Sequence, residues 1–136
     1  MVTPQEGLQR LVAASESGRL DEVCRRQRIR ILTVFGSTGR GDPDPADLDV
    51  GVSFEPGTVP DVLALLSDLH AVAGREVDLA VVDRASPLLR AHALMHAVPV
   101  WEAVPGLWIN TAVAANLEAM DTAWLRRLDL ERMAAR

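Results

Sequence analysis

The sequence predicts an α/β protein in which helices flank a small β-sheet. Three observations favour this class. Apolar residues recur at helical spacing in several segments, other segments alternate apolar and polar residues as strands do, and glycine or proline separates the two kinds. The 136 residues suffice for one domain with one core. We therefore expect a single domain over residues 1–136, without internal repeats.

The first part of the chain predicts two helices and a strand. Residues 3–6, with the sequence TPQE, have the form of a capping box with proline at the first helical position, and the apolar stripe that follows ends near Gly18. A second short helix is expected over residues 20–27. Residues 29–35 are apolar and β-branched enough to form a buried strand that ends at a Gly-Ser turn.

The Gly-Ser turn has the properties of a phosphate site. It starts a turn or short helix whose first backbone N–H groups are free, and Gly36 lets a ligand approach the backbone closely. The hydroxyl of Ser37 adds a rotatable donor. We therefore expect this turn to accept phosphate.

A loop with the sequence DPDP follows, and residues 47–54 then alternate polar and apolar side chains as a strand does. This period of two predicts that Asp47 and Asp49 project from one face of the strand. Carboxylates about 4 Å apart repel by about 4 kcal/mol at an effective dielectric near 20, so a cation would relieve their convergence. Mg²⁺ suits such a pair because it takes one or two protein carboxylates and fills its octahedron with water and substrate phosphates.

A third acid stands in the strand expected over residues 76–82. Asp78 is a charged residue within an apolar stretch. If this strand lies beside that of Asp49, Asp78 either completes a second metal site or takes the proton of an attacking hydroxyl. Each acid alone could equally be a solvated strand face or a loop-end cap, so the argument depends on their occurrence together with the Gly-Ser turn.

The remaining segments complete the layer of helices and strands. A helix is expected from Pro60 to Gly74 and another from Ser86 to about Ala97. Residues 98–102 predict a short edge strand, which Pro99 would suit. His92 and His96 are four residues apart, but no acid or cysteine nearby would complete a zinc site, so we expect ordinary surface or packing histidines.

A long amphipathic helix is expected over about residues 107–133. An apolar stripe recurs along it at helical spacing, formed by Ile109, Val113, Leu117, Met120, Trp124 and Leu128. Such a stripe normally packs on the core, so we expect it to lie against the sheet. The alternative is a partner surface, because exposed tryptophans are favoured anchors at interfaces.

The central motif resembles a known family. Phe35-Gly36-Ser37, nine intervening residues and then Asp47-Leu48-Asp49-Val50 resemble the signature of the DNA polymerase beta-like nucleotidyltransferases. The small size and the run GSTGRG are most similar to the minimal nucleotidyltransferases (MNT), the antitoxin partners of HEPN proteins in prokaryotic toxin–antitoxin pairs. The resemblance covers about residues 29–102 and implies a polymerase beta-like fold with a small mixed sheet.

The resemblance also implies roles for individual residues. Gly36 and Ser37 would bind the nucleoside triphosphate, and Arg40 would help hold phosphate or a partner. Asp47 and Asp49 would bind Mg²⁺. Asp78 would be the third catalytic carboxylate and a further metal ligand.

The sequence departs from the family at two positions near the motif. Gly39 stands where many relatives have alanine, and Ala46 where many have serine. Neither change removes a metal ligand, although the loss of a hydroxyl beside Asp47 could weaken the support of that carboxylate.

The activity that the resemblance implies is Mg²⁺-dependent transfer of AMP from ATP to a tyrosine of a HEPN ribonuclease toxin, as the antitoxin of a type VII pair. This chain has no tyrosine and so cannot modify itself on one. Two alternatives remain, an antitoxin that acts by binding alone and a small-molecule transferase of the aminoglycoside-modifying kind. The intact acids argue against the first, and the lack of an evident acceptor domain argues against the second.

Composition limits the partners and the compartment. A net charge of −5 and a pI near 5.1 argue against an extended nucleic-acid surface. The single Cys24 excludes an internal disulfide and fits a reducing compartment. No apolar stretch reaches the length of a membrane span, and the first residues do not have the form of a secretion signal. We therefore expect a cytoplasmic protein. The resemblance further implies a HEPN partner, with the chain either a homo-oligomer or a hetero-oligomer with that toxin.

Overall fold

The fold is described for residues 1–134 of the chain by a computed structural model. Helices and strands alternate along it in the order α1 (Pro4–Glu16), α2 (Arg19–Arg26), β1 (Ile29–Phe35), α3 (Gly36–Arg40), β2 (Asp49–Phe54), α4 (Val62–Ala73), β3 (Asp78–Val81), the 3-10 turn η1 (Val82–Arg84), α5 (Pro87–Leu94), β4 (Val98–Glu102) and α6 (Leu107–Ala134). The side chain of Thr3 caps α1 by accepting from the backbone N–H of Glu6 at 3.2 Å, as the capping box predicts.

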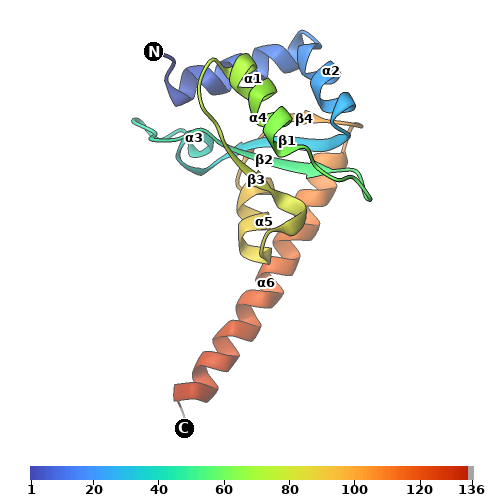
Figure 1. The fold of residues 1–136 in the computed structure, drawn as a ribbon. Coiled ribbons are helices and arrows are strands. Elements are labelled where there is room, and N and C mark those ends of the chain that lie inside the picture. Colours follow the sequence, from blue (N-terminus) through green and yellow to red (C-terminus); the bar gives the residue numbers. More distant parts are fainter. Residues whose placement is uncertain (135–136) are drawn as a thin grey trace.

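The four strands form one mixed sheet in the order β3-β2-β1-β4. β1 is antiparallel to both β2 and β4, whereas β2 and β3 are parallel. Helices α1, α2 and α4 cover one face of the sheet, and α5 and the start of α6 cover the other (Figure 1). The expectation of a small mixed sheet flanked by helices is confirmed, and β4 lies at an edge as Pro99 suggested.

The larger core lies between the sheet and helices α1, α2 and α4. Alternate residues of β1 and β2 point into it, because successive strand side chains face opposite sides of a sheet. Its fully buried side chains include Leu11, Leu20, Leu32, Val50, Val52, Leu65 and Leu69. This apolar layer fixes the sheet against the helices and leaves the other face of β2 available for polar side chains.

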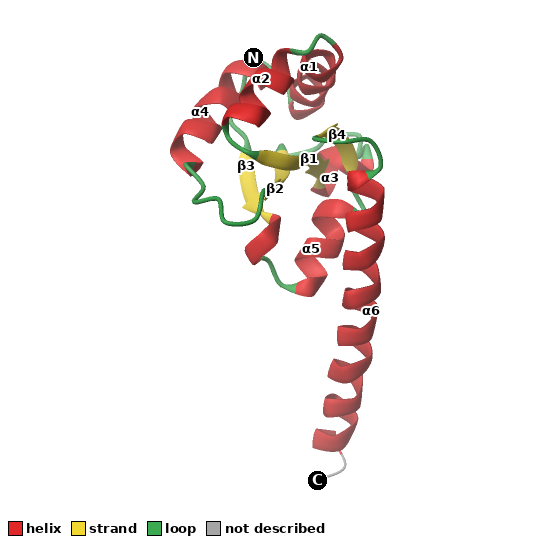
Figure 2. Ribbon diagram, turned by 90° about the vertical axis from the view of Figure 1, so that its right-hand side faces the viewer, coloured by secondary structure: helices red, strands yellow, loops and turns green. Residues whose placement is uncertain are grey.

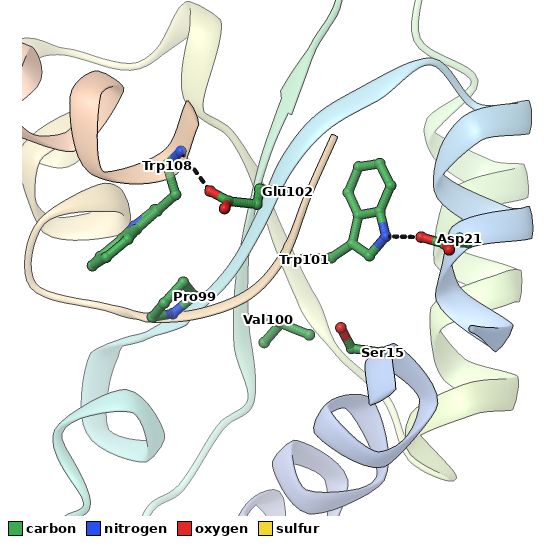
Figure 3. Close-up of a pocket in the computed structure, with 7 residues that line it drawn as sticks. All are labelled: Ser15, Asp21, Pro99, Val100, Trp101, Glu102 and Trp108. Carbon is green, nitrogen blue, oxygen red and sulfur yellow. Dashed lines mark hydrogen bonds between the residues drawn. The ribbon is translucent and has the colours of Figure 1, made fainter. Parts of the chain in front are cut away.

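Trp101 of the edge strand β4 connects the sheet to α2. Its indole N–H donates to a carboxylate oxygen of Asp21 at 2.6 Å (Figure 3), and the guanidinium of Arg25 lies 5.6 Å from the ring centroid. The ring itself is buried. A hollow of about 420 Å³ lies beside these residues, but its two carboxylates are already paired, Asp21 with this indole and Glu102 with backbone N–H groups at the start of α6.

Small side chains let α5 pack closely on the second face of the sheet. A Cβ atom on Gly51 would lie 2.6 Å from the hydroxyl oxygen of Thr33 and 3.2 Å from the Cβ of Ala93. Thr33 is fully buried and donates its hydroxyl to the carbonyl of Ala93. The close approach therefore requires glycine at this point of β2, and the hydroxyl of Thr33 compensates for its burial with a hydrogen bond.

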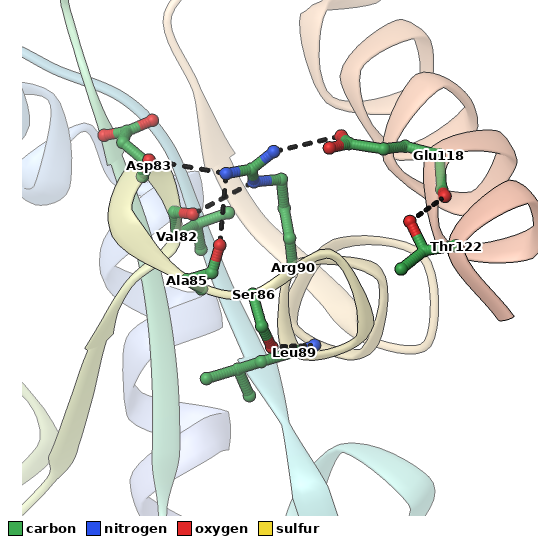
Figure 4. Close-up of polar contacts among 8 residues, drawn as sticks. All are labelled: Val82, Asp83, Ala85, Ser86, Leu89, Arg90, Glu118 and Thr122. Carbon is green, nitrogen blue, oxygen red and sulfur yellow. Dashed lines mark hydrogen bonds and ion pairs between the residues drawn. The ribbon is translucent and has the colours of Figure 1, made fainter. Parts of the chain in front are cut away.

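Arg90 fixes α5 to its neighbours (Figure 4). Its guanidinium donates to the carbonyls of Val82 and Ala85 in and after η1, at 3.2 and 3.1 Å, and to the carboxylate of Glu118 on α6 at 3.0 Å. One side chain therefore joins the segment after β3, α5 and α6.

The expected packing of the α6 stripe on the sheet is wrong. Among the side chains of α6 that the structure describes, the buried ones are the alanines Ala112, Ala115 and Ala119, whose small size lets the helix lie close to α5. The large apolar side chains lie on other faces and are 41% to 61% exposed at Ile109, Val113, Leu117, Met120 and Trp124. The far half of α6 projects well beyond the body of the protein (Figure 2).

Several element boundaries differ from the sequence prediction. β2 begins at Asp49, so Asp47 lies in the preceding loop and not in the strand. β3 begins at Asp78, and α5 ends at Leu94, short of Ala97, so that the chain can turn into β4. Within residues 1–134, every helix falls short of the combined length and apolar character that crossing a bilayer requires.

The packing of α6 gives a first prediction. Ala115→Leu should lower the free energy of unfolding by about 1–3 kcal/mol, because the larger side chain must displace α5 from a tightly packed contact. Leu117→Ala, two residues away and 57% exposed, should change it by less than about 0.5 kcal/mol. Urea denaturation of both variants measures this. An equal loss of stability in the two would mean that the stripe, and not the alanines, is packed.

Candidate active site

Three acids lie at one edge of the sheet, where β1 ends and β2 and β3 begin. Antiparallel pairing places Phe35, the last residue of β1, opposite Asp49, and parallel pairing places Asp49 opposite Asp78. Asp47 lies two residues before β2. The topology therefore brings Asp47, Asp49 and Asp78 together, as the sequence led us to expect if their strands were neighbours.

Gly36 connects this acidic edge to the Gly-Ser turn that begins α3. Its φ of 69° lies in the left-handed region, which lets the chain turn sharply from β1 into α3. A Cβ atom at this position would collide with the carboxylate of Asp49. Glycine is thus required twice, once for the backbone conformation and once for the close approach of Asp49.

Ser37 and Arg40 lie on the five-residue helix α3. The residue before this helix, Phe35, has no side-chain acceptor, so the first backbone N–H groups of α3 receive no hydrogen bond from an N-cap side chain. Ser37 is half-buried in the first turn of the helix. Arg40 is exposed and pairs with Asp42 at 3.1 Å, a contact that solvent screens and that a phosphate could replace.

Thr38 is a positioning residue that the sequence argument missed. Its side chain is buried, and its hydroxyl donates to the backbone carbonyl of Asp47 at 2.6 Å. Because Asp47 lies in a loop, this bond holds its backbone in place where a strand ladder does not. The threonine that follows the Gly-Ser pair was the available signal.

The glycine at position 39 has a steric explanation. A Cβ atom there would lie 2.6 Å from the backbone carbonyl oxygen of Val34. Since backbone atoms cannot rotate away, an alanine would require α3 to shift away from β1. Ala46 is exposed in the loop, and no contact in the structure explains its identity.

The electrostatics of the site centre on Asp49. Partial burial raises the pKa of its carboxyl above the usual value, and the charges of Asp78 and Asp47 raise it further, while Arg40 acts in the opposite direction. Asp47 and Asp78 are both exposed to solvent, whereas Asp49 is half-buried. The electrostatic repulsion among the three acids therefore acts mainly on the ionised form of Asp49. A bound cation would remove this cost.

The three acids fit a Mg²⁺ ion whose remaining ligands come from water and from a bound substrate. Within residues 1–134, no three or more carboxylate, imidazole or thiol side chains are grouped closely enough to form a metal cage by themselves. Mg²⁺ does not need one, because two carboxylates plus water and phosphate oxygens complete its shell. The raised pKa of Asp49 beside two further acids is the observation that favours a cation here. A small cavity of about 150 Å³, lined by Asp47, Asp78, Arg75 and Glu76, adjoins the group.

Known proteins are similar to this chain in sequence and in fold. The profile of the family described as "Polymerase beta, Nucleotidyltransferase" matches residues 19–104. A predicted protein adenylyltransferase of Methanocaldococcus jannaschii is 32% identical over 80 residues, which are 57% of this chain and 86% of that protein. A solved structure of a predicted minimal nucleotidyltransferase is 32% identical over 68% of this chain and 94% of its own, with a TM-score of 0.54.

A more distant structure agrees in fold. The solved complex of a tri-AMPylated Shewanella oneidensis HEPN toxin with an MNT antitoxin contains a chain with a TM-score of 0.56 and 19% identity, over 91% of this chain and 94% of that one. The fold and the acidic edge define a nucleotidyltransferase. The chain belongs to the polymerase beta nucleotidyltransferase family.

The raised pKa of Asp49 gives a second prediction. Because the folded pKa exceeds the unfolded one, ionised Asp49 destabilises the metal-free fold once the pH rises through the folded pKa. Asp49→Asn should therefore raise the melting temperature of metal-free protein at pH 7, by an effect worth less than about 1 kcal/mol because solvent screens the acids. The gain should shrink as the pH falls through the raised pKa. Asp44→Asn in the preceding loop is the control, and a gain equal to that of Asp49→Asn would contradict the prediction.

Proposed function

We propose that this chain is a Mg²⁺-dependent adenylyltransferase that moves AMP from ATP to a tyrosine of a cognate HEPN ribonuclease toxin, and so acts as the antitoxin of a type VII pair. The observation that carries the proposal is the meeting of Asp47, Asp49 and Asp78 with the Gly36 turn at one sheet edge. The groups proposed to bind phosphate and those proposed to bind the metal are therefore neighbours. The M. jannaschii relative and the AMPylated toxin of the Shewanella complex support AMP as the group transferred.

The triphosphate would bind along α3. The first backbone N–H groups of this helix and the hydroxyl of Ser37 donate to phosphate oxygens, and Arg40 turns from Asp42 to the outer phosphates. Asp47 and Asp49 would hold Mg²⁺ against the triphosphate. Bound there, the metal supplies charge neutralisation for the phosphoryl oxygens.

The acceptor hydroxyl would approach from the side of Asp78. Its oxygen forms a bond to the α-phosphorus, the bond between the α-phosphorus and the bridging oxygen to the β-phosphate breaks, and pyrophosphate leaves in line. The hydroxyl proton passes to the carboxylate of Asp78, which is exposed at the start of β3 and free to accept it. The register that pairs Asp78 with Asp49, a proposed metal ligand, supports this role.

The acceptor must come from another molecule, since this chain has no tyrosine. The exposed apolar stripe of α6 offers a docking surface for the acceptor protein. Large side chains of this stripe, such as Trp124, remain exposed within residues 1–134. This same exposure favours a second candidate, an antitoxin that neutralises its partner by binding alone. The two differ in whether the partner gains an adenylyl group.

Co-expression with the HEPN protein tests the chemistry. The partner should gain one or more adenylyl mass increments on tyrosine with the parent, and Asp47→Asn should reduce the rate of modification by about 100-fold or more because one metal ligand loses its charge. Asp44→Asn is the matched control in the same loop and should modify at the parental rate. Intact-mass spectrometry of the partner measures both. Neutralisation of the toxin by the parent without any increment would favour the binding-only antitoxin.

Association with the partner can be tested separately from AMP transfer. Trp124→Ala should weaken association with the partner by about tenfold or more, because an exposed tryptophan on an apolar stripe is a typical anchor. Asp129→Ala, which removes an exposed side chain of the same helix outside the stripe, should leave the affinity unchanged. Calorimetric titration of the purified partner measures the two variants. Equal affinities for Trp124→Ala and the parent would show that the partner docks outside the stripe.

A further inference from the structure

β3 is an edge strand with a free outer side. It ends the sheet on the side away from β4 and pairs with β2. The backbone N–H of Asp78 donates to the carbonyl of Leu48 at 2.9 Å, so this residue faces β2. Since backbone groups alternate along a strand, Ala80 also faces β2, whereas the N–H groups of Leu79 and Val81 point away from it. No backbone carbonyl within residues 1–134 accepts from these two N–H groups.

The side chains of β3 divide between the two faces of the sheet. Those of Leu79 and Val81 pack against the larger core. Asp78 lies opposite Asp49, and residues that face each other on neighbouring strands project from the same face. A segment added to the free edge of β3 would continue this row, with facing Cβ atoms roughly 5 Å apart. One of its side chains would therefore lie beside Asp78, on the side away from Asp49.

A small polar cavity marks the start of this edge. It has a volume of about 150 Å³ and is lined by Asp47, Leu48, Arg75, Glu76 and Asp78. Pockets for whole small molecules are typically about 300 Å³ or more, so this cavity suits a single side chain. Its carboxylates can accept a hydrogen bond from a hydroxyl. Strand addition typically combines a row of backbone hydrogen bonds with pockets for alternate side chains, and both features occur at β3.

The length of β3 limits what can pair with it. The strand has only four residues, and so short an edge offers few hydrogen bonds and resists aggregation. It therefore does not suit a permanent contact between subunits. It does suit a short segment of a protein that is already held elsewhere, for example at the exposed stripe of α6.

We propose that the acceptor protein presents its hydroxyl on an extended segment that pairs with the free edge of β3. The inference rests on the proposed function, because it assigns the way in which the acceptor reaches the same site. The outward N–H groups of Leu79 and Val81, the row formed by Asp49 and Asp78, and the adjoining cavity carry it. A tyrosine can reach Asp78 from the facing position or from the next one on that face, because diagonal neighbours roughly 7–8 Å apart remain within reach of aromatic side chains.

A proline at position 81 tests the pairing. The φ of Val81 is −81°, near the value that proline requires, and its N–H faces away from β2, so Val81→Pro should fold while losing one outward donor. Val81→Ala shortens the same side chain and keeps the N–H, so it measures the effect of packing alone. Single-turnover AMP transfer to the HEPN partner should be at least about tenfold slower in Val81→Pro than in Val81→Ala. Titration should give both variants the same affinity for Mg²⁺-ATP.

Hydrogen exchange gives a second measurement that needs no substitution in β3. The complex of the Asp47→Asn chain with the HEPN partner keeps the acceptor unmodified, and NMR resolves the individual amides. The N–H groups of Leu79 and Val81 should exchange at least about tenfold more slowly in this complex than in the free chain. The N–H of Ala80 faces β2 in both states, so it should exchange slowly in both and serves as the internal control.

Equal transfer rates in Val81→Pro and Val81→Ala would overturn the inference. So would unchanged exchange at Leu79 and Val81 in the complex while the parent still modifies the partner. If Val81→Pro also loses affinity for Mg²⁺-ATP, the exchange measurement alone decides. Protection that appears in the isolated chain and grows with its concentration would assign the edge to a second copy. A parent that transfers no AMP to the partner would instead refute the proposed function, and the inference with it.

Discussion

The missing side chain of Gly36 is the constraint on which the site depends. Because no Cβ atom stands there, the chain can leave β1 with a left-handed residue and the carboxylate of Asp49 can occupy the space beside it. The turn proposed to bind phosphate and the carboxylate proposed to bind Mg²⁺ are thereby placed side by side. Any side chain at this position would separate the two halves of the chemistry, whatever happened to the remaining acids.

The two faces of the sheet are built by different means, and the difference serves the site. Large aliphatic side chains form the core under α1, α2 and α4. The opposite face uses Gly51, Thr33 and small residues of α5, so that a helix lies close to the strands without covering the acidic edge. Arg90 then fixes this helix by donating hydrogen bonds to the backbone carbonyls of Val82 and Ala85.

The sequence allowed most of the fold to be predicted, because local signals and tertiary packing agree there. The capping box of α1 and the strand nature of residues 29–35 and 98–102 are examples. What failed depends on contacts between distant residues. Period-two alternation cannot reveal that β2 begins only at Asp49, nor that Thr38 holds the loop at Asp47. The stripe of α6 was assigned to the core because large apolar side chains usually pack inward, whereas here three alanines do so.

The far end of α6 bears on how readily proteases degrade the protein when no partner is bound. Beyond Ala119 none of the described side chains is buried, so roughly four turns of helix are held only by their own backbone hydrogen bonds. A helix of that length is marginal in water, and such segments open locally at little cost in free energy. Open backbone is what proteases cleave. The abundance of this chain would then follow that of whatever covers the helix, which couples protein turnover to complex formation without any dedicated degradation signal.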